Sequence, residues 1–142
     1  MYRIREVEAT DEDVADTLTE LHRSTFLDSA PVPAFDDGHW WLAFRGNTPV
    51  AFAGVVPSTH VSGAGYFSRV GVLGKHCGHG LQLRLMRAME ARARENGWDS
   101  IISDTTDNVR SANNLIRGGY RLFIPAHPWA WANTLYWRKD MK

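Results

Sequence analysis

Short blocks of apolar residues, some alternating with polar neighbours, run along most of the chain and are typical of β-strands. Residues 2–7 alternate apolar and charged side chains, which predicts a half-buried first strand. Aromatic and β-branched residues fill 39–45 and 50–56 on either side of a Gly-Asn-Thr-Pro turn, so we expect a β-hairpin there. The same criteria predict further strands at 66–73, 98–103, 120–124 and 134–141.

Three other segments have the apolar spacing of amphipathic helices. The first begins near Asp11, carries acidic residues in its first turn and extends to residue 26, and Thr10 is expected to cap it. Residues 81–97 place leucine, alanine and methionine on one face and arginine on another, and residues 107–119 form a shorter helix. The prolines of 28–38 end the first helix and predict a mobile or substrate-facing loop.

The order of these elements predicts the fold class. Strands dominate the first half, and strands and helices alternate in the second half, which indicates an α/β protein with a mixed sheet and helices packed on it. A chain of 142 residues has the usual size of one domain and is long enough to bury a core. We therefore expect a single domain over residues 1–142.

Composition and charge exclude some functions and leave others open. The 16 basic and 16 acidic residues balance, so no charge excess indicates a nucleic acid or an anionic membrane as partner. The first residues lack the apolar core of a signal peptide, and no segment has the length of a membrane span. A single cysteine, Cys77, cannot form an internal disulfide. Together these features favour a cytoplasmic protein.

A glycine-rich turn lies between a predicted strand and the longest predicted helix, in the sequence VGVLGKHCGHGLQLRLM. Such a turn aims backbone N–H groups at one point near the positive end of the helix dipole, where Gly78 and Gly80 allow close approach of a phosphate. The Walker and Rossmann glycine patterns are both absent. A metal site is disfavoured because no second Cys or His pair accompanies His76, Cys77 and His79. The segment is interpreted either as an anion-binding turn or as a plain strand-to-helix turn. In the anion-binding interpretation, the His79 side chain is a possible extra partner for the phosphate.

Two motifs in order resemble the GNAT superfamily of acyl-CoA-dependent N-acetyltransferases. The family's cofactor signature, Val-x-Pro followed by Arg/Gln-Gly-x-Gly-x-Gly/Ala at the start of a long helix, is matched by 72–74 and 77–82. The second signature, an Asn followed by small residues and a Gly-Phe pair, is matched at Asn108, Ser111, Ala112, Gly119 and Tyr120. The resemblance covers about 66–141, and it implies a mostly antiparallel central sheet flanked by helices, with acetyl-CoA as co-substrate.

The resemblance also implies how a cofactor would be held. Backbone groups near Val70, Gly71 and Val72 would pair with the pantetheine arm like an added strand. The amides of the glycine turn would hold the pyrophosphate, and these belong to Gly78, His79, Gly80, Leu81, Gln82 and Leu83. Asn108 would contact the arm near the thioester, and Ser111 and Asn114 would face the same groove. Helix capping is the alternative role for Asn108 and Ser111.

This sequence departs from the family pattern at three positions. Cys77 stands where the family has Arg or Gln, and Gln82 stands where it has a small residue. Leu115 occupies the position of the tyrosine that many members use to protonate the departing thiolate. That role is either filled elsewhere or not needed.

Acetyl transfer to an amine needs a base, a donor to the thioester oxygen and a proton for the thiolate. The family's oxygen donor is a backbone N–H, here near Val72. Asp104 is the candidate base, with a turn or cap role as its alternative. Tyr136 is a candidate proton donor with packing as its alternative, and His127 is a third candidate.

The acceptor is the least readable part of the sequence. An acceptor site could be walled by Trp40, Trp41, Trp129 and Trp131, although core packing is the default for the paired strand tryptophans. The leading hypothesis is an N-acetyltransferase acting on a primary amine of a small molecule, an amino acid derivative or a peptide terminus. A catalytically silent acyl-CoA-binding module and an acetyltransferase toxin acting on aminoacyl-tRNA are the alternatives, and a homodimer is left open.

Overall fold

The computed structural model describes residues 1–27, 29–35 and 37–141, and its strands form one seven-stranded sheet in the order β1-β2-β3-β4-β5-β7-β6. All neighbouring strands are antiparallel except β4 and β5, which are parallel. The strands are β1 (Tyr2–Val7), β2 (His39–Arg45), β3 (Thr48–Pro57), β4 (Ala64–Val72), β5 (Ser100–Thr105), β6 (Arg121–Leu122) and β7 (Leu135–Asp140). The helices are α1 (Glu12–Phe26), α2 (Leu81–Glu95), α3 (Val109–Arg117) and the short 3-10 helix η1 (Gly74–His76).

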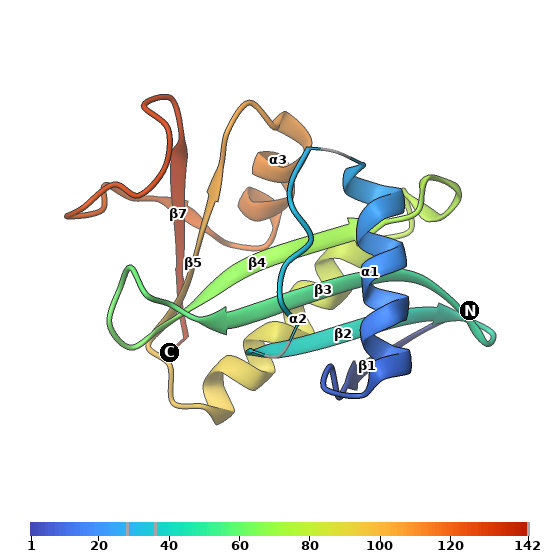
Figure 1. Ribbon diagram of the computed structural model, residues 1–142. Coiled ribbons are helices and arrows are strands. Elements are labelled where there is room, and N and C mark those ends of the chain that lie inside the picture. The colour runs from blue at the N-terminus through green and yellow to red at the C-terminus, as the bar shows by residue number, and fades with distance from the viewer. Residues whose placement is uncertain (28, 36, 142) are drawn as a thin grey trace.

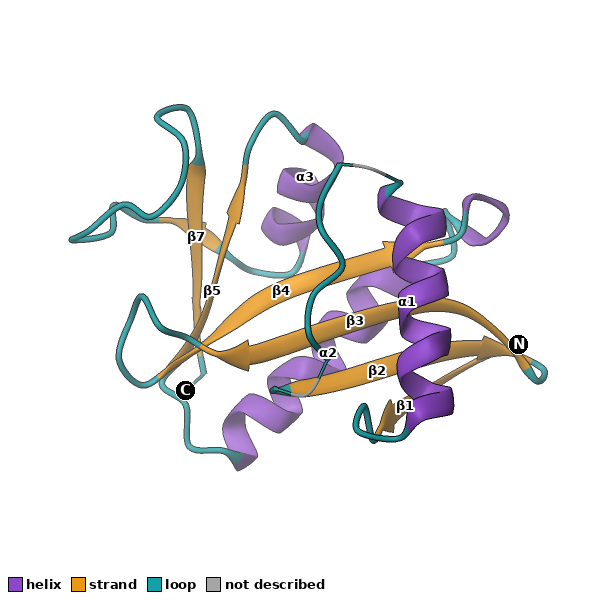
Figure 2. Ribbon diagram, in the orientation of Figure 1, coloured by secondary structure: helices purple, strands orange, loops and turns teal. Residues whose placement is uncertain are grey.

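The helices cover both faces of the sheet. Figure 1 shows α1 across one face of β2, β3 and β4, with α2 behind the sheet and α3 beside the upper end of β5. The colouring of Figure 2 makes the three layers of helix, sheet and helix visible. The prediction of a mixed, mostly antiparallel sheet flanked by helices is confirmed.

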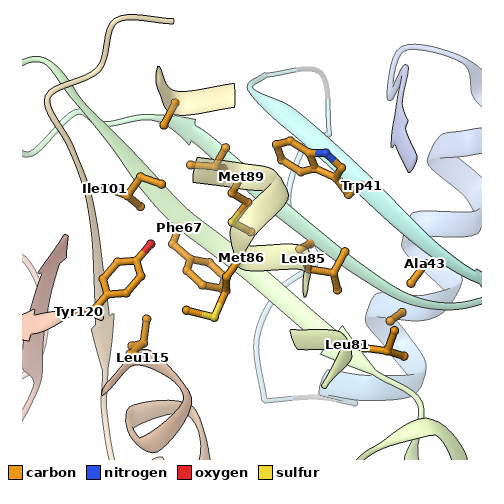
Figure 3. Close-up of a cluster of buried hydrophobic side chains, with 14 of the residues drawn as sticks. Trp41, Ala43, Phe67, Leu81, Leu85, Met86, Met89, Ile101, Leu115 and Tyr120 are labelled. Atoms are coloured by element: carbon orange, nitrogen blue, oxygen red, sulfur yellow. The ribbon is translucent and has the colours of Figure 1, made fainter. Parts of the chain in front are cut away.

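Strand alternation divides the core into two clusters. Trp40 and Leu42 of β2 pack toward α1, whereas their neighbours Trp41 and Ala43 pack toward α2. The cluster on the α2 face also contains Phe67, Ile101 and Tyr120, and Figure 3 shows these side chains together with methionines and leucines of α2. The buried pair of tryptophans therefore belongs to the core and walls no acceptor site, which corrects that hypothesis for Trp40 and Trp41.

The cap of the first helix lies one residue later than expected. Asp11 is the N-cap, and its side chain accepts hydrogen bonds from the backbone N–H groups of Asp13 and Val14, at 2.9 and 3.3 Å. Thr10 instead bonds Glu8 through its hydroxyl, so the expectation that Thr10 caps the helix is wrong. Both residues are polar and adjacent, and only the backbone turn decides which of them faces the free amides.

Three smaller expectations changed. The strand expected at 120–124 shrinks to two residues in β6, and Tyr120 is buried in the core beside it. The turn before α2 contains η1, which the glycine pattern did not predict. Asp28 and Asp36 of the proline-containing loop, and Lys142, lie outside the described residues.

None of the described helices has the length and apolar character needed to cross a membrane.

Candidate active site

The parallel strands β4 and β5 pair over a short stretch and then separate. The gap between the diverging strands, called the wedge below, is where the candidate site lies. The strands pair only where Ala64–Tyr66 faces Ser100–Ile102, and beyond this point the described residues of the two strands form no further pair. The Ser103 hydroxyl donates a hydrogen bond of 3.2 Å to the Phe67 carbonyl across the first part of the gap. Figure 1 shows β4 and β5 diverging toward α3.

A groove of about 820 Å³ lies at the open end of this wedge, between the end of α1, strand β4, the glycine turn and α3. Among the predicted cofactor residues, its lining includes Val70, Gly71, Val72, Gly78, Gly80, Leu81, Gln82, Leu83, Asn108, Ser111 and Asn114. The side chain of His79 packs instead beside the ring of Tyr2, with 5.5 Å between ring centroids. The structure thus brings together residues from three separate segments of the chain.

One side of the groove is an unpaired strand edge. The N–H of Leu73 donates to the carbonyl of Val50 in β3, at 3.0 Å. Because backbone groups alternate sides along a strand, the N–H and C=O groups of Val70 and Val72 face the opposite way, toward the groove. An extended ligand can pair with this edge as an additional strand would.

The glycine turn supplies free donors at the start of α2. Among the described residues, none accepts a hydrogen bond from the backbone N–H groups of residues 78–83. Gly78 and Gly80 have φ angles of +84° and +74°, and Gly80 is the N-cap of the 15-residue helix. These left-handed conformations suit glycine, and a Cβ at either position would meet nothing within 4 Å. The turn therefore presents an open cluster of N–H groups at the positive end of a helix.

Helix α3 closes the groove and is tied to α2. Asn114 donates through Nδ2 to Oε1 of Gln82 at 2.9 Å, whereas Nε2 of Gln82 is buried with no acceptor among the described residues. Asn108 is the N-cap of α3, and its Oδ1 accepts the N–H of Ser111 at 3.0 Å. The structure thus places Asn108 in its capping role at the edge of the groove.

The groove is also lined by two arginines that the sequence motifs did not identify. Arg110 and Arg117 come from the two ends of α3, and Arg110 Nη1 lies 3.9 Å from Cys77 Sγ. His76 also lines the groove and shares a 2.9 Å hydrogen bond between its Nδ1 and the Tyr2 hydroxyl. The only sequence signal for Arg110 was its position in the first turn of a capped helix, which says nothing about the loop it approaches.

Asp104 lies on the face of the sheet that α1 covers, beside the wedge. Its Oδ2 accepts two hydrogen bonds, from the Tyr66 hydroxyl at 2.6 Å and from Trp129 Nε1 at 2.9 Å. Burial, and then the nearby Asp104 carboxylate, raise the pKa of Tyr66 above its ordinary value. Asp104 is therefore held by two donors on one oxygen, and neither Tyr66 nor the Trp129 contact was predicted from the sequence.

Aromatic rings surround this carboxylate. Tyr136 pairs with Asp104 in the β5–β7 register, and its hydroxyl oxygen accepts the N–H of Ala130 at 3.1 Å. The ring of Trp129 meets Tyr136 edge-on at 4.6 Å and stacks on His60 at 4.5 Å with 5° between their planes. Tyr136 is itself buried, and Asp104 and Tyr136 lie outside the lining of the groove.

The remaining candidates lie apart from this cluster. His127 is exposed in the loop after β6, and Trp131 is 76% exposed in the same loop. No group of three or more His, Cys, Asp or Glu side chains within the described ranges is arranged to hold a metal ion. The polar groups around the groove and the wedge thus include backbone and side-chain amides, an imidazole, a carboxylate, hydroxyls and guanidinium groups.

Comparison with known proteins places the chain in a family. Residues 3–120 match the acetyltransferase (GNAT) family over most of the chain's length. The chain belongs to this family. No curated protein matches the chain in sequence.

Solved GNAT structures share the fold at low sequence identity. An acetyltransferase of the GNAT family from Staphylococcus aureus Mu50 has a TM-score of 0.79 and 15% identity, with 100% of both chains covered. The aminoglycoside 6'-acetyltransferase type Ii has a TM-score of 0.79 and 16% identity, covering 99% of this chain and 97% of that one. The ribosomal-protein-S18-alanine N-acetyltransferase from Escherichia coli has a TM-score of 0.75 and 11% identity, covering 99% and 94%. These likenesses concern the fold alone.

Leu115 stands at the position where the family resemblance implies a tyrosine. Its side chain is only 2% exposed, and Figure 3 shows it between Met86 and Tyr120 in the core on the α2 face. It offers no polar atom to the groove. In the structure, Leu115 therefore offers no proton donor at this position, and that role is either filled by another group or not needed.

Proposed function

We propose that residues 1–142 act as one acetyltransferase domain that moves an acetyl group from acetyl-CoA directly to a primary amine. The observation that carries this proposal is the combination, in one groove, of the free N–H groups of 78–83 with the unpaired edge of β4. An acyl-CoA has a matching shape, because an amide-containing arm follows its pyrophosphate.

The residues present fit that ligand. The amides of residues 78–83 and the Arg110 guanidinium suit the pyrophosphate, and the unsatisfied Nε2 of Gln82 offers a further donor. Val70 and Val72 offer their backbone groups to the amides of the arm, and Gly71 between them lines the groove while its own backbone groups face β3. Asn108, Ser111 and Asn114 border the same groove from α3. The side chain of His79 points toward Tyr2, which leaves its backbone N–H as its contribution.

The chain's own groups can carry out the transfer chemistry. A backbone N–H near Val72, on the open edge of β4, would donate to the thioester oxygen. Asp104 is the proposed base for the attacking amine, because its Oδ1 carries none of the hydrogen bonds that hold Oδ2. Tyr136 stays a predicted proton donor from the sequence, and its hydroxyl oxygen is already engaged by Ala130.

The acceptor is proposed as an amine on a small molecule, an amino acid derivative or a peptide terminus. The names of two structural relatives specify an aminoglycoside and a ribosomal-protein alanine, and both compounds carry amines. We therefore expect an amine panel that includes both classes to contain a substrate. A cytoplasmic location, a homodimer and the absence of a nucleic acid partner stay predictions from the sequence.

A catalytically silent acyl-CoA-binding module is the second candidate, because Leu115 supplies no acid. Calorimetric titration with acetyl-CoA, desulfo-CoA and ADP, followed by thiol release over the amine panel, separates the two. Binding that Gly80→Glu abolishes, together with thiol release for at least one amine, supports the enzyme. Binding without release for any amine supports the silent module, and no binding refutes both.

A further inference from the structure

Tyr66 occupies the point where the wedge between β4 and β5 begins. It is the last residue of β4 that pairs with β5, opposite Ile102, and its side chain is only half-buried. Its hydroxyl reaches Asp104, two residues farther along β5, at 2.6 Å. The hydroxyl and carboxylate thus join the two strands at the apex of the wedge whose open end holds the groove.

A β-bulge decides which way Tyr66 faces. The β3–β4 register passes from Gly54–Arg69 to Val55–Phe67, which leaves Ser68 as an extra residue. Phe67 and Val70 therefore pack on the α2 face, while Tyr66 and Arg69 lie on the α1 face. Tyr66 consequently shares the acceptor side of the sheet with Asp104.

We propose that Tyr66 and Asp104 form one proton-transfer pair, in which Tyr66 gives the proton to the departing thiolate. This inference rests on the proposed acetyl transfer and fills the role left open by Leu115. As the neutral amine forms its bond to the acetyl carbon, Asp104 takes one N–H proton. The carbon–sulfur bond breaks, Tyr66 passes its hydroxyl proton to sulfur, and Asp104 returns its proton to the Tyr66 oxygen.

These proton transfers balance without any further reactant. One proton leaves nitrogen and one arrives on sulfur, and both side chains end in their starting states. A tyrosine hydroxyl is protonated at neutral pH, so the proton is present when the thiolate forms. Burial and then the Asp104 carboxylate raise the pKa of Tyr66, and the effect of the carboxylate charge is removed once Asp104 has taken the amine proton. Trp129 donates to the same carboxylate oxygen and keeps Asp104 in place as a positioning residue.

The other tyrosines are less suited to this role. Tyr136 is 8% exposed and its hydroxyl oxygen accepts the N–H of Ala130. It is the register partner of Asp104 across β5 and β7, but no side-chain hydrogen bond in the described part of the chain joins the two. Tyr120 is buried in the core on the α2 face, and Tyr2 bonds His76. Tyr66 is the one whose hydroxyl already contacts the candidate base.

A change of leaving group tests the proposal. The variant Tyr66→Phe should transfer acetyl from acetyl-CoA about 100-fold more slowly, because a general acid contributes at least that much. An acetyl thioester of 4-nitrothiophenol releases a thiolate that is stable without a proton, so Tyr66→Phe should retain wild-type kcat/KM with it within about threefold. Equal losses with both donors, or no loss with acetyl-CoA, would overturn the role of Tyr66.

Two further variants make the outcome specific. Tyr120→Phe removes a buried hydroxyl that has no partner among the described residues, and it should leave both rates unchanged. If Tyr136→Phe alone shows the leaving-group-dependent loss, the proton comes from Tyr136 and the proposal is wrong. If the wild-type protein releases no thiol with any amine, the proposed function fails, whereas a wild-type enzyme with an unaffected Tyr66→Phe refutes only the proton role.

Discussion

The guanidinium of Arg110 lies 3.9 Å from the thiol of Cys77, although the two residues belong to different elements. Cys77 stands where the GNAT pattern has Arg or Gln, at the entrance of the glycine turn. Arg110 comes from the first turn of α3, and it brings a cation to the same place from the opposite wall of the groove. The charge missing from the motif is thus supplied by another helix.

Replacing this cation should weaken cofactor binding. We expect Arg110→Ala to raise the Kd for acetyl-CoA about tenfold, the effect of losing one charge-assisted contact of about 1.4 kcal/mol. Arg87→Ala, which removes an exposed arginine of α2 outside the groove lining, is the matched control for net charge. Equal Kd values for the two variants, measured by calorimetry at the same ionic strength, would contradict a role for Arg110.

Substitution of Gly80 tests whether the free amides of residues 78–83 bind acetyl-CoA, once the effect of backbone strain on stability is controlled for. Gly80→Ala should lower the free energy of unfolding by about 1 kcal/mol, because alanine is strained at a φ of +74°. It should also weaken acetyl-CoA binding, because relief of that strain moves the free amides. Gly46, with a φ of +61° and equally open space, provides the control in the β2–β3 turn. Gly46→Ala should show the same loss of unfolding free energy in urea and an unchanged Kd for acetyl-CoA. A parallel loss of binding in Gly46→Ala would refute the role of the glycine-turn amides.

His22 predicts how stability changes with pH. Burial, and second the Arg69 guanidinium, lower the pKa of His22, whose Nε2 accepts a 3.2 Å hydrogen bond from Arg69 Nε. The unfolded chain, with a histidine pKa of about 6.5, therefore binds more protons than the folded chain below that pH. This contribution is fully present above pH 6.5 and is lost as pH falls, with a slope of at most ~1.4 kcal/mol per unit.

The variant His22→Gln isolates this term, because an amide oxygen can still accept from Arg69 without titrating. Urea unfolding between pH 5 and 8 should give a shallower acid decline for His22→Gln than for the wild type. Identical slopes would mean that His22 is protonated in the folded protein.

Restoring the family's tyrosine at Leu115 should not restore its function. The Leu115 side chain is 2% exposed and surrounded by core residues, so Leu115→Tyr overpacks the cluster at a cost of about 1–3 kcal/mol. Thermal unfolding should show the loss of stability, and thiol release should not rise. An increase in kcat would show that a tyrosine at this position reaches the groove after all.

The sequence predicted elements well where local chemistry determines them. The hairpin around Gly46 was found because aromatic and β-branched runs flank a turn sequence, and the long helix 81–97 because its apolar stripe is regular. The cap at Asp11 was missed because two adjacent polar residues are equivalent in sequence. β6 was overestimated because its pattern does not reveal that only two residues pair.

The candidate site was predictable only in its contiguous part. The glycine turn and the β4 edge are short motifs, whereas Tyr66 and Trp129 reach Asp104 from 38 and 25 residues away along the chain. The bulge at Ser68 also changes which side chains share a face, and strict alternation would have put Tyr66 and Val70 together. The bulge shifts the alternation between Phe67 and Val70, but the sequence alone does not show which residue is the extra one.

The parallel contact of β4 with β5 spans only three residue pairs, yet it joins β1–β4 to β5–β7. The sheet is thus two half-sheets meeting at a narrow seam, as the diverging strands in Figure 2 illustrate. The free backbone amides of residues 78–83 lie in the turn after β4, in one half, whereas Asp104 and Trp129 belong to the other half and Tyr66 reaches Asp104 across the seam. Under the proposed acetyl transfer, we therefore expect changes in the 123–134 loop to alter which amine is accepted while the free amides of residues 78–83 stay in place.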